Sequence, residues 1–168
     1  YDRSDASNNT VWAAGVTGGL WKTTNFSDAE PSWSNIDDFF DNLTISSIIQ
    51  DPFNNNIIYF GTGEGWQRNG IFRGLGIWKT TNGGNSWSQV SSTNNNEFHY
   101  IQDLIIDRYG NLYATTNDGL KRSTDGGNTW DTVLEGLFAD LELGADGDVY
   151  ATEGLIYSTG RVWKSDDA

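Results

Sequence analysis

The residue types that could catalyse a reaction are few in this chain of 168 residues. It has one histidine, His99, and no cysteine, while Asp and Glu together number 23. The absence of cysteine excludes thiolate catalysis, disulfides and cysteine-based zinc sites, and one imidazole is too few for most transition-metal centres. A serine hydrolase would have to use His99, and the sequence has no Gly-x-Ser-x-Gly motif to accompany it. Carboxylate chemistry remains, and we expect His99 to be a hydrogen-bonded turn residue.

Two carboxylates could act as general acid and general base in the hydrolysis of a glycosidic bond. Such a pair lies either about 5 Å or about 6.5–9.5 Å apart, and its acid has a raised pKa. At a formal net charge of −13, the abundance of acidic residues does not mark a pair. We therefore assign no catalytic residue, although six carboxylates are available: Asp37, Asp38, Asp41, Glu64, Glu97 and Glu153.

Aromatic side chains stand beside charged ones in four segments, residues 35–42, 61–75, 91–99 and 153–161. Aromatic rings stack on sugar rings while charged groups exchange hydrogen bonds with hydroxyls, so this mixture suits a glycan. The alternative is that the aromatic residues cover strand ends and the arginines pair with nearby carboxylates. The candidate ligand-binding residues are Asp38, Phe39, Glu64, Trp66, Arg68, Phe72, Arg73 and Tyr157.

Other ligand classes find little support in the composition. Aspartate-rich turns such as residues 145–148 offer oxygen ligands for calcium, but the EF-hand pattern with its closing glutamate is absent. We expect solvated turns, no metal site and no cofactor, with calcium kept as an open alternative. A pI near 4.1 without a Lys/Arg cluster argues against nucleic acid and anionic lipid. No apolar run approaches the roughly 18 residues of a membrane span, so we expect no membrane insertion.

The elements that must position these residues are short strands. The chain is 14% aromatic and contains 20 glycines but only 2 prolines. A mean hydropathy of −0.54 is low for a helical bundle. Aromatic residues with frequent glycine and no low-complexity tract favour many short strands joined by tight turns.

One motif recurs along the chain and organises it. Its clearest copy reads Ser-Thr-Asp-Gly-Gly-Asn-Thr-Trp from Ser123, and another reads Thr-Thr-Asn-Gly-Gly-Asn-Ser-Trp from Thr80. An earlier copy with an insertion begins at Thr23, and a last one opens at Ser165. The first residues of successive copies are 57, 43 and 42 apart, a spacing typical of repeat architectures. The motif residues are Thr23, Asn25, Trp33, Thr80, Asn82, Gly84, Trp87, Ser123, Asp125, Gly127, Trp130 and Ser165.

The motif has the form S/T-x-D/N-x-G-x-S/T-W, the Asp-box pattern, and it predicts a hairpin between two strands. The Asp or Asn caps a tight turn, and glycine supplies a positive φ. We expect the two Ser/Thr residues to exchange hydrogen bonds across the hairpin, and the closing Trp to pack against the neighbouring repeat. These residues are predicted to be structural.

Between the motifs, apolar residues alternate with the period of a strand. Four antiparallel strands in each 40 to 50 residues, about the length of a β-propeller blade, predict that fold. We divide the chain into blade 1, incomplete, at about residues 1–40; blade 2 at 44–92; blade 3 at 98–136; and blade 4, incomplete, at 138–168. The strands expected are residues 11–14, 45–50, 57–62, 76–80, 87–90, 100–107, 112–116, 120–123, 130–134, 141–143 and 149–152.

The expected fold is therefore all-β, a β-propeller segment of about three and a half four-stranded antiparallel blades. Residues 1–9 are read as the end of an inner strand and its turn. A closed ring needs roughly 4–8 blades, so we expect the segment to belong to a longer propeller whose remaining blades are its partners. The alternative is that half-rings dimerise. In this geometry the candidate ligand residues share the rim opposite the hairpins.

Residues 18–25, 51–64 and 78–84 carry a family resemblance that covers essentially the whole chain. They resemble the Asp-box (BNR-type) β-propellers of the sortilin-type and xyloglucanase-like group, common in secreted bacterial proteins. The resemblance implies an exported protein, extracellular or at the cell surface. It also implies that an outer-membrane secretion or adhesion complex could be a partner, as for cargo of a type IX secretion system or an adhesin.

The same resemblance weakens an enzymatic interpretation. Xyloglucan-cleaving relatives carry a catalytic Asp shortly before a Gly-Gly pair, and Val16 stands there in this chain. Sialidase relatives need an arginine triad, whereas the arginines here are scattered. We therefore expect a non-catalytic binding or interaction scaffold for a glycan or protein ligand. The alternative is a fragment of a glycoside hydrolase, xyloglucanase-like or sialidase-like, with catalytic residues partly outside the chain. A third possibility is a purely structural spacer.

Overall fold

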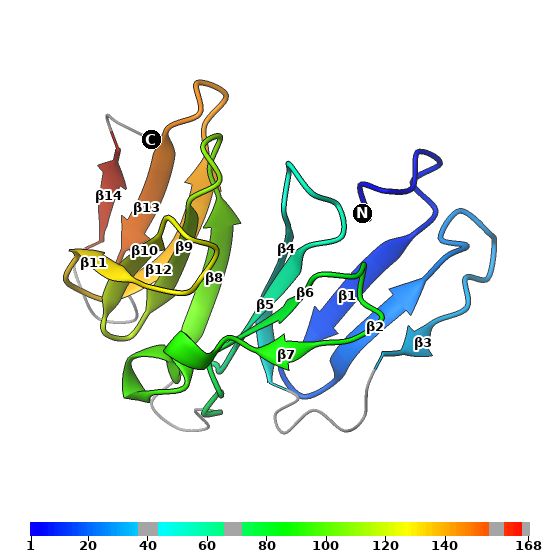
Figure 1. Ribbon diagram of the computed structural model, residues 1–168, viewed down its shortest axis with the longest axis horizontal. Helices are drawn as coiled ribbons and strands as arrows, with labels where there is room; N and C mark the ends of the chain where they lie inside the picture. Colours follow the sequence, from blue (N-terminus) through cyan, green and yellow to red (C-terminus); the bar gives the residue numbers. More distant parts are fainter. Residues whose placement is uncertain (37–43, 66–71, 155–159, 166–168) are drawn as a thin grey trace.

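The computed structural model describes residues 1–36, 44–65, 72–154 and 160–165. These residues form four antiparallel sheets of three or four strands, and the helices among them are two 3-10 helices of three residues each (Figure 1). The expectation of an all-β, partial β-propeller is confirmed. We number the sheets 1 to 4 in chain order.

Sheets 1 and 2 occupy the right half of Figure 1. Sheet 1 has three strands, and sheet 2 has four in the order β4-β5-β6-β7. Their bounds are β1 Val11–Gly15, β2 Gly19–Thr23, β3 Ser34–Asn35, β4 Ile45–Gln50, β5 Ile58–Thr62, β6 Ile77–Thr80 and β7 Ser88–Gln89.

Sheets 3 and 4 follow after the two 3-10 helices, η1 and η2. Sheet 3 has the order β8-β9-β10-β11, and sheet 4 has three strands, β12-β13-β14. The bounds are η1 Ser91–Thr93, η2 Asn96–Phe98, β8 Ile101–Ile106, β9 Leu112–Thr116, β10 Gly119–Ser123, β11 Asp131–Leu134, β12 Phe138–Leu143, β13 Val149–Glu153 and β14 Arg161–Lys164. Strand β12 begins three residues earlier than the sequence pattern indicated, because Phe138 pairs with Glu153 across a bulge.

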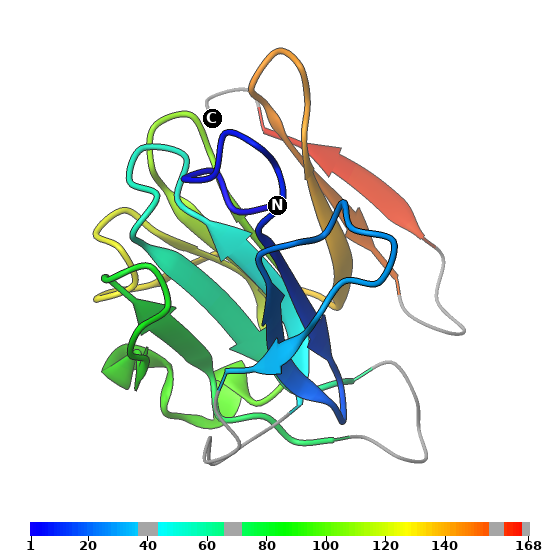
Figure 2. The ribbon, with the colours of Figure 1, turned by 90° about the vertical axis from the view of Figure 1, so that its right-hand side faces the viewer.

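The first strands of sheets 2, 3 and 4 are β4, β8 and β12, and they form an inner row in which β4 contacts β8 and β8 contacts β12. Figures 1 and 2 show the sheets spread about this inner row, each twisted relative to the next. Each pair of consecutive sheets encloses one cluster of buried apolar side chains. The second strands β5 and β9 lie inside the sheets, and all five residues of each are buried.

A β-bulge occurs at the same place in each inner strand. The pairing register shifts at the second residue, which is Ser46 in β4, Gln102 in β8 and Ala139 in β12. A bulge re-aims the extra side chain out of the alternating pattern. The polar pair Ser46 and Gln102 can therefore sit within strands whose other residues are largely apolar.

Residues 1–10 form turns rather than a strand. The N–H of Asp2 donates to Thr10 O at 2.9 Å, and Asp2 Oδ1 accepts the N–H of Ser4 at 2.9 Å. Asp51 and Asp107 make the same two kinds of bond after β4 and β8. Asp2 thus occupies the position that follows an inner strand in sheets 2 and 3.

The repeated Gly-Gly turns are held by the central Asn or Asp. In the turn between β6 and β7, Asn82 Oδ1 accepts both the Thr80 hydroxyl at 2.8 Å and the Ser86 N–H at 3.0 Å. Asp125 accepts the corresponding bonds from Ser123 Oγ and Thr129 N–H, at 2.8 and 2.9 Å. The expectation that the two Ser/Thr hydroxyls bond each other was wrong, because both bond the amide or carboxylate between them.

The copy with an insertion forms the same turn. Asn25 Oδ1 accepts the Thr23 hydroxyl at 2.9 Å and the Ser32 N–H at 3.0 Å. Ser165 starts the last copy and exchanges two hydrogen bonds with Val149, while residues 166–168 lie outside the described part of the chain. The turn chemistry therefore tolerates a longer loop, because one side-chain oxygen bridges its ends.

The closing tryptophans pack in two different ways. Trp87 meets the Trp12 ring of sheet 1 edge to face, with centroids 6.1 Å apart. Trp130 contacts Phe98 at 5.2 Å and donates to Ser92 Oγ at 3.2 Å, both in the connection that precedes sheet 3. Trp33 instead remains partly exposed against Phe26. The side chains of Trp87 and Trp130 thus pack between consecutive sheets.

Candidate functional site

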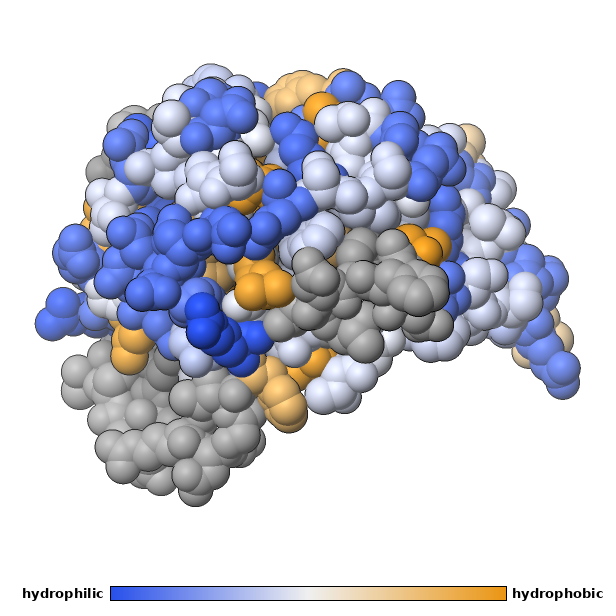
Figure 3. Space-filling model, turned by 60° about the horizontal axis from the view of Figure 1, so that its bottom comes forward, coloured by the Kyte–Doolittle hydropathy of each residue, from blue (hydrophilic) through white to orange (hydrophobic). Residues whose placement is uncertain are grey.

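The candidate site lies at one edge of the sheets. The turns after the inner strands point upward in Figure 1, and the β1–β2 turn and the 3-10 helices lie at the lower edge. Figure 3 brings this lower edge forward and shows a mainly hydrophilic face with small hydrophobic spots. Of the predicted ligand residues, Glu64, Phe72 and Arg73 belong to the described chain. Asp38, Phe39, Trp66, Arg68 and Tyr157 lie outside the described residues, as do Asp37 and Asp41.

Glu64 and Phe72 are brought together at the base of the β5–β6 connection. Glu64 N–H donates to Phe72 O at 2.8 Å, an isolated antiparallel bridge. Gly63 next to it has φ +96°, and a Cβ at Gly63 would run into the carbonyl oxygen of His99. Only glycine allows this close approach, which holds the base of the connection against the segment that leads into β8.

Arg73 and His99 form the polar contact beside this base. Arg73 Nη2 lies 2.7 Å from His99 Nε2. Partial burial lowers the pKa of His99, and the positive charge of Arg73 lowers it further. Because arginine can only donate, His99 Nε2 accepts its hydrogen bond, and this contact requires the neutral form of the imidazole.

Gln102, the bulged residue of β8, lies next to the same connection. A Cβ on Gly65 would be 2.7 Å from Gln102 Nε2 and 2.9 Å from Asn117 Oδ1, so both amides flank Gly65. Gln102 is 5% exposed, and among the described residues neither its Nε2 nor its Oε1 has a hydrogen-bond partner. Burying an amide without hydrogen-bond partners costs folding free energy, so its presence in a folded chain calls for an explanation. We call Glu64, Phe72, Arg73, His99, Gln102 and Asn117 the rim cluster.

Lys121 carries a buried charge close by. It is 3% exposed, and its Nζ donates to Glu97 Oε2 at 2.9 Å, Asp118 Oδ2 at 3.2 Å and Thr132 Oγ1 at 2.8 Å. Burial lowers the pKa of Lys121, but the hydrogen bonds to the two carboxylates outweigh it and the net pKa is raised. The carboxylate of Glu97 thus forms an ion pair with Lys121.

Among the carboxyl groups of the described residues, Asp103 is the one with a raised pKa. Burial raises the pKa, and hydrogen bonds from Ser47 and from the backbones of Leu104 and Leu141 offset it in part. Ser47 Oγ and Leu104 N–H both lie 2.8 Å from Oδ1, and Leu141 N–H lies 3.1 Å from Oδ2. With both oxygens bonded to three strands, Asp103 joins the inner row of the fan. Sequence reasoning missed it and Gln102, and the only signal was a polar pair inside the apolar segment 100–107.

The aspartates of the turn at residues 145–148 pair with a lysine side chain of the same chain. Lys164 Nζ lies 2.7 Å from Asp148 Oδ2 and 3.6 Å from Asp146 Oδ2. Strand β14 brings Lys164 beside this turn, whose Ala145 and Asp146 are exposed to solvent. Among residues 1–36, 44–65, 72–154 and 160–165, no three acidic or histidine side chains gather as a metal site.

Comparisons with known proteins agree on the fold. No family model matches the chain. The xyloglucanase Xgh74A of Acetivibrio thermocellus is 30% identical over 154 residues, which cover 68% of this chain and 16% of that protein. The chain therefore spans about 16% of the length of this curated relative.

Solved structures resemble nearly the whole chain. An ancestral GH74 enzyme matches 96% of it with a TM-score of 0.71 and 22% identity, over 23% of the enzyme. The extracellular domain of a putative one-component system from B. thetaiotaomicron matches 96% with a TM-score of 0.65 and 17% identity, over 20% of that chain. YCF48 bound to the D1 peptide matches 92% with a TM-score of 0.58 and 17% identity, over 49% of that chain. At these identities the likeness shows a shared β-propeller-type fold.

Among the described residues, no helix is both long and apolar enough to cross a bilayer.

Proposed function

We propose that this chain is a non-catalytic, glycan-binding segment of a β-propeller protein that is extracellular or at the bacterial cell surface. The observation that carries the proposal is the buried amide of Gln102, which has no hydrogen-bond partner in the described part of the chain and lies against Gly65 at the rim cluster. An amide that is both donor and acceptor can bond two neighbouring sugar hydroxyls, and this would compensate the cost of its burial.

The composition of the rim cluster supports a sugar as the ligand. Phe72 is 46% exposed and offers an apolar face. The Arg73 guanidinium, steadied by His99, and the Asn117 amide add fixed donors for hydroxyl groups. Aromatic rings beside hydrogen-bonding side chains are the usual means of holding a pyranose ring. Similarity to a xyloglucanase is a further support for the glycan class.

Two observations favour binding over hydrolysis. The raised pKa of Asp103 would suit a general acid, but its two oxygens already accept hydrogen bonds from Ser47, Leu104 and Leu141. Val16, in the turn between β1 and β2, has no titratable group at the place where the resemblance implies a catalytic Asp. Neither residue can serve as the acid of a carboxylate pair.

A second candidate function is that of a glycoside hydrolase fragment with catalytic residues partly outside the chain. The 30% identity to a xyloglucanase favours it. The two candidates differ in one measurement, the release of reducing sugar from xyloglucan. A binding segment retains the polysaccharide and releases none, whereas hydrolysis that disappears on a single Asp or Glu substitution would establish the hydrolase.

The binding proposal is tested by affinity electrophoresis and calorimetry with soluble xyloglucan and other plant and bacterial polysaccharides. Phe72→Ala should weaken retention about three- to tenfold, the loss expected from one aromatic stacking contact. Phe53→Ala is the matched control, since Phe53 is 65% exposed but lies in the β4–β5 turn at the opposite edge. Equal effects of the two substitutions, or no retention of any polysaccharide, would contradict the proposal and favour a structural spacer or a protein ligand.

A further inference from the structure

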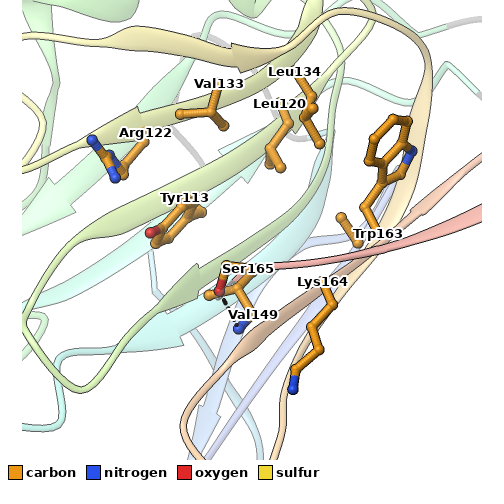
Figure 4. A pocket seen from close by; sticks show the side chains of 10 residues that line it. Tyr113, Leu120, Arg122, Val133, Leu134, Val149, Trp163, Lys164 and Ser165 are labelled. Carbon is orange, nitrogen blue, oxygen red and sulfur yellow. Dashed lines mark hydrogen bonds between the residues drawn. The ribbon is translucent and has the colours of Figure 1, made fainter. Parts of the chain in front are cut away.

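A groove of about 410 Å³ opens between sheets 3 and 4 (Figure 4). One wall comes from β9, β10 and β11, and the other from β13 and β14 and the residue after it. Its apolar lining is Tyr113, Leu120, Val133, Leu134, Val149, Ala151 and Trp163. The groove is distinct from the rim cluster, with which it shares no residue.

The same position between sheets 2 and 3 is filled by a tryptophan. The registers place Tyr59 opposite Lys79 and Tyr113 opposite Arg122, so the two interfaces correspond residue by residue. Between sheets 2 and 3, Trp130 packs on the buried cluster that contains Tyr59, Ile77 and Leu112. The corresponding cluster between sheets 3 and 4 contains Tyr113, Leu120 and Val149. Trp163 of β14 lines the groove, but no tryptophan from a Gly-Gly turn packs on this cluster among the described residues.

The interface between sheets 1 and 2 is filled in the same way. There Trp87 packs on a cluster with Leu20 and Phe60, and it meets Trp12, which occupies the position of Tyr59 and Tyr113. Trp87 and Trp130 both close a Gly-Gly turn and precede the fourth strand of their sheet. The tryptophans that fill these two interfaces therefore indicate that a tryptophan would also fit between sheets 3 and 4.

The polar wall of the groove contains one buried donor that has no partner in the described part of the chain. Between sheets 2 and 3, Tyr59 OH and Lys79 Nζ both donate to the carbonyl oxygen of Gly126, in the Gly-Gly turn of the next sheet, at 3.3 and 3.1 Å. Tyr113 and Arg122 stand in the corresponding places, where their side chains hydrogen-bond each other. Arg122 Nε is buried and has no hydrogen-bond partner among the described residues. A glycine carbonyl supplied to the groove would satisfy this donor.

Strand β14 offers the remaining surface. Among the described residues it pairs with β13 on one side only, and all four of its residues are exposed. An open edge of this kind accepts an added strand through backbone hydrogen bonds, while pockets for alternate side chains give specificity.

We propose that the groove is the acceptor site for a peptide of the chain's own repeat chemistry, Gly-Gly-x-Ser/Thr-Trp followed by a β-strand. The tryptophan fills the groove, the turn glycine carbonyl accepts from Arg122 Nε, and the strand adds to β14 as the fourth of sheet 4. This inference is independent of glycan binding, because it uses none of the rim cluster.

The test uses the 168-residue chain and a synthetic peptide with the sequence of residues 123–134, together with its Trp→Ala variant. Calorimetry should detect binding of the first peptide, and thermal unfolding should shift upward. The variant should bind at least about tenfold more weakly, the loss expected when a large buried aromatic ring is removed. Equal binding of the two peptides, or no binding of either, would overturn the proposal.

Two matched substitutions locate the binding. Val133→Lys places a long charged side chain in the groove and should weaken peptide binding about tenfold or more. Val162→Lys is the control, because Val162 lies on β14 but is 73% exposed and does not line the groove. Light scattering on the chain alone tests a second copy as the occupant, and a dimer that excludes the peptide and is broken by Val133→Lys would overturn the assignment.

Discussion

Asp103 of β8 accepts the backbone N–H of Leu141 of β12 through Oδ2, at 3.1 Å. One sheet earlier, Ser47 of β4 accepts the N–H of Leu104 of β8 through its hydroxyl oxygen, also at 3.1 Å. Ser47 and Asp103 hold the same place, directly after the bulge of their strands. Each inner strand therefore presents a side-chain acceptor to the edge of the next, which fixes the order and spacing of the sheets.

Removing the Asp103 carboxylate should destabilise the chain. Asp103→Ala leaves the N–H of Leu141 without its acceptor, and an unpaired buried N–H costs about 1–3 kcal/mol. Denaturant unfolding followed by tryptophan fluorescence measures the loss. Asp140→Ala is the matched control, because Asp140 has the equivalent place on β12 but is exposed. A similar loss for both variants would contradict the role of Asp103 as a link between sheets.

The repeat turn of sheet 3 should lose stability in acid. The N–H and hydroxyl of Thr129 and the hydroxyl of Ser123 bond the carboxylate of Asp125 and lower its pKa from 3.8 to about 2. Because the native state binds this proton more weakly than the unfolded chain, the stabilisation is present above pH 3.8 and disappears as the pH falls towards about 2. Urea midpoints measured between pH 5 and pH 2, about the window of these two pKa values, should show the decline.

The control for this pH dependence exists in the chain itself. Asn82 holds the equivalent turn without a carboxylate, so Asp125→Asn should fold and should lack the part of the acid dependence due to Asp125. An unchanged pH profile in this variant would show that other acidic groups dominate.

Gly84→Ala should destabilise the folded chain much more than Gly83→Ala. Both glycines have a positive φ, which costs any other residue about 1–2 kcal/mol. A Cβ at Gly84 would also collide with the Trp12 ring, whereas at Gly83 the nearest atom is Asn56 Oδ1 at 3.6 Å. Overpacking adds about 1–3 kcal/mol, so Gly84→Ala should lose that much more than Gly83→Ala. Thermal unfolding of the two variants compares them, and equal melting temperatures would refute the packing of Trp12 on this turn.

Gln102→Leu should make the chain more stable and less able to bind a glycan. The substitution replaces a buried amide that has no partner among the residues described by an apolar side chain of similar size, which is expected to gain about 1–3 kcal/mol. Asn117→Ala is a control for stability, because Asn117 is exposed and its loss should change the free energy of unfolding by less than about 0.5 kcal/mol. A gain in stability with unchanged glycan retention would remove Gln102 from the proposed binding site.

Much of the local structure was predictable because its interactions are close in the chain. The bonds of Asn82 join residues two and four positions apart, and those of Asn25 join residues two and seven apart. The Gly-Gly pairs and the period-2 alternation likewise act over a few residues, so the all-β fold followed from them. At the candidate site, the types of residue in the sequence indicated Glu64, Phe72 and Arg73. The base of the β5–β6 connection that carries them depends on the close approach of Gly63 to His99, which the sequence does not show.

The amino-acid sequence by itself determined the hairpin turns, the strands and the fan of sheets, since these depend on short-range hydrogen bonds and on the side-chain period. Only the tertiary structure decided that Gln102 is buried with no hydrogen-bond partner in the described ranges, that Asp103 holds Leu141 across 38 positions, and that a groove separates sheets 3 and 4. A bulge shifts the register by one residue, and contacts between sheets join distant segments. Neither effect leaves a periodic signal in the sequence, because each depends on how the sheets meet in space.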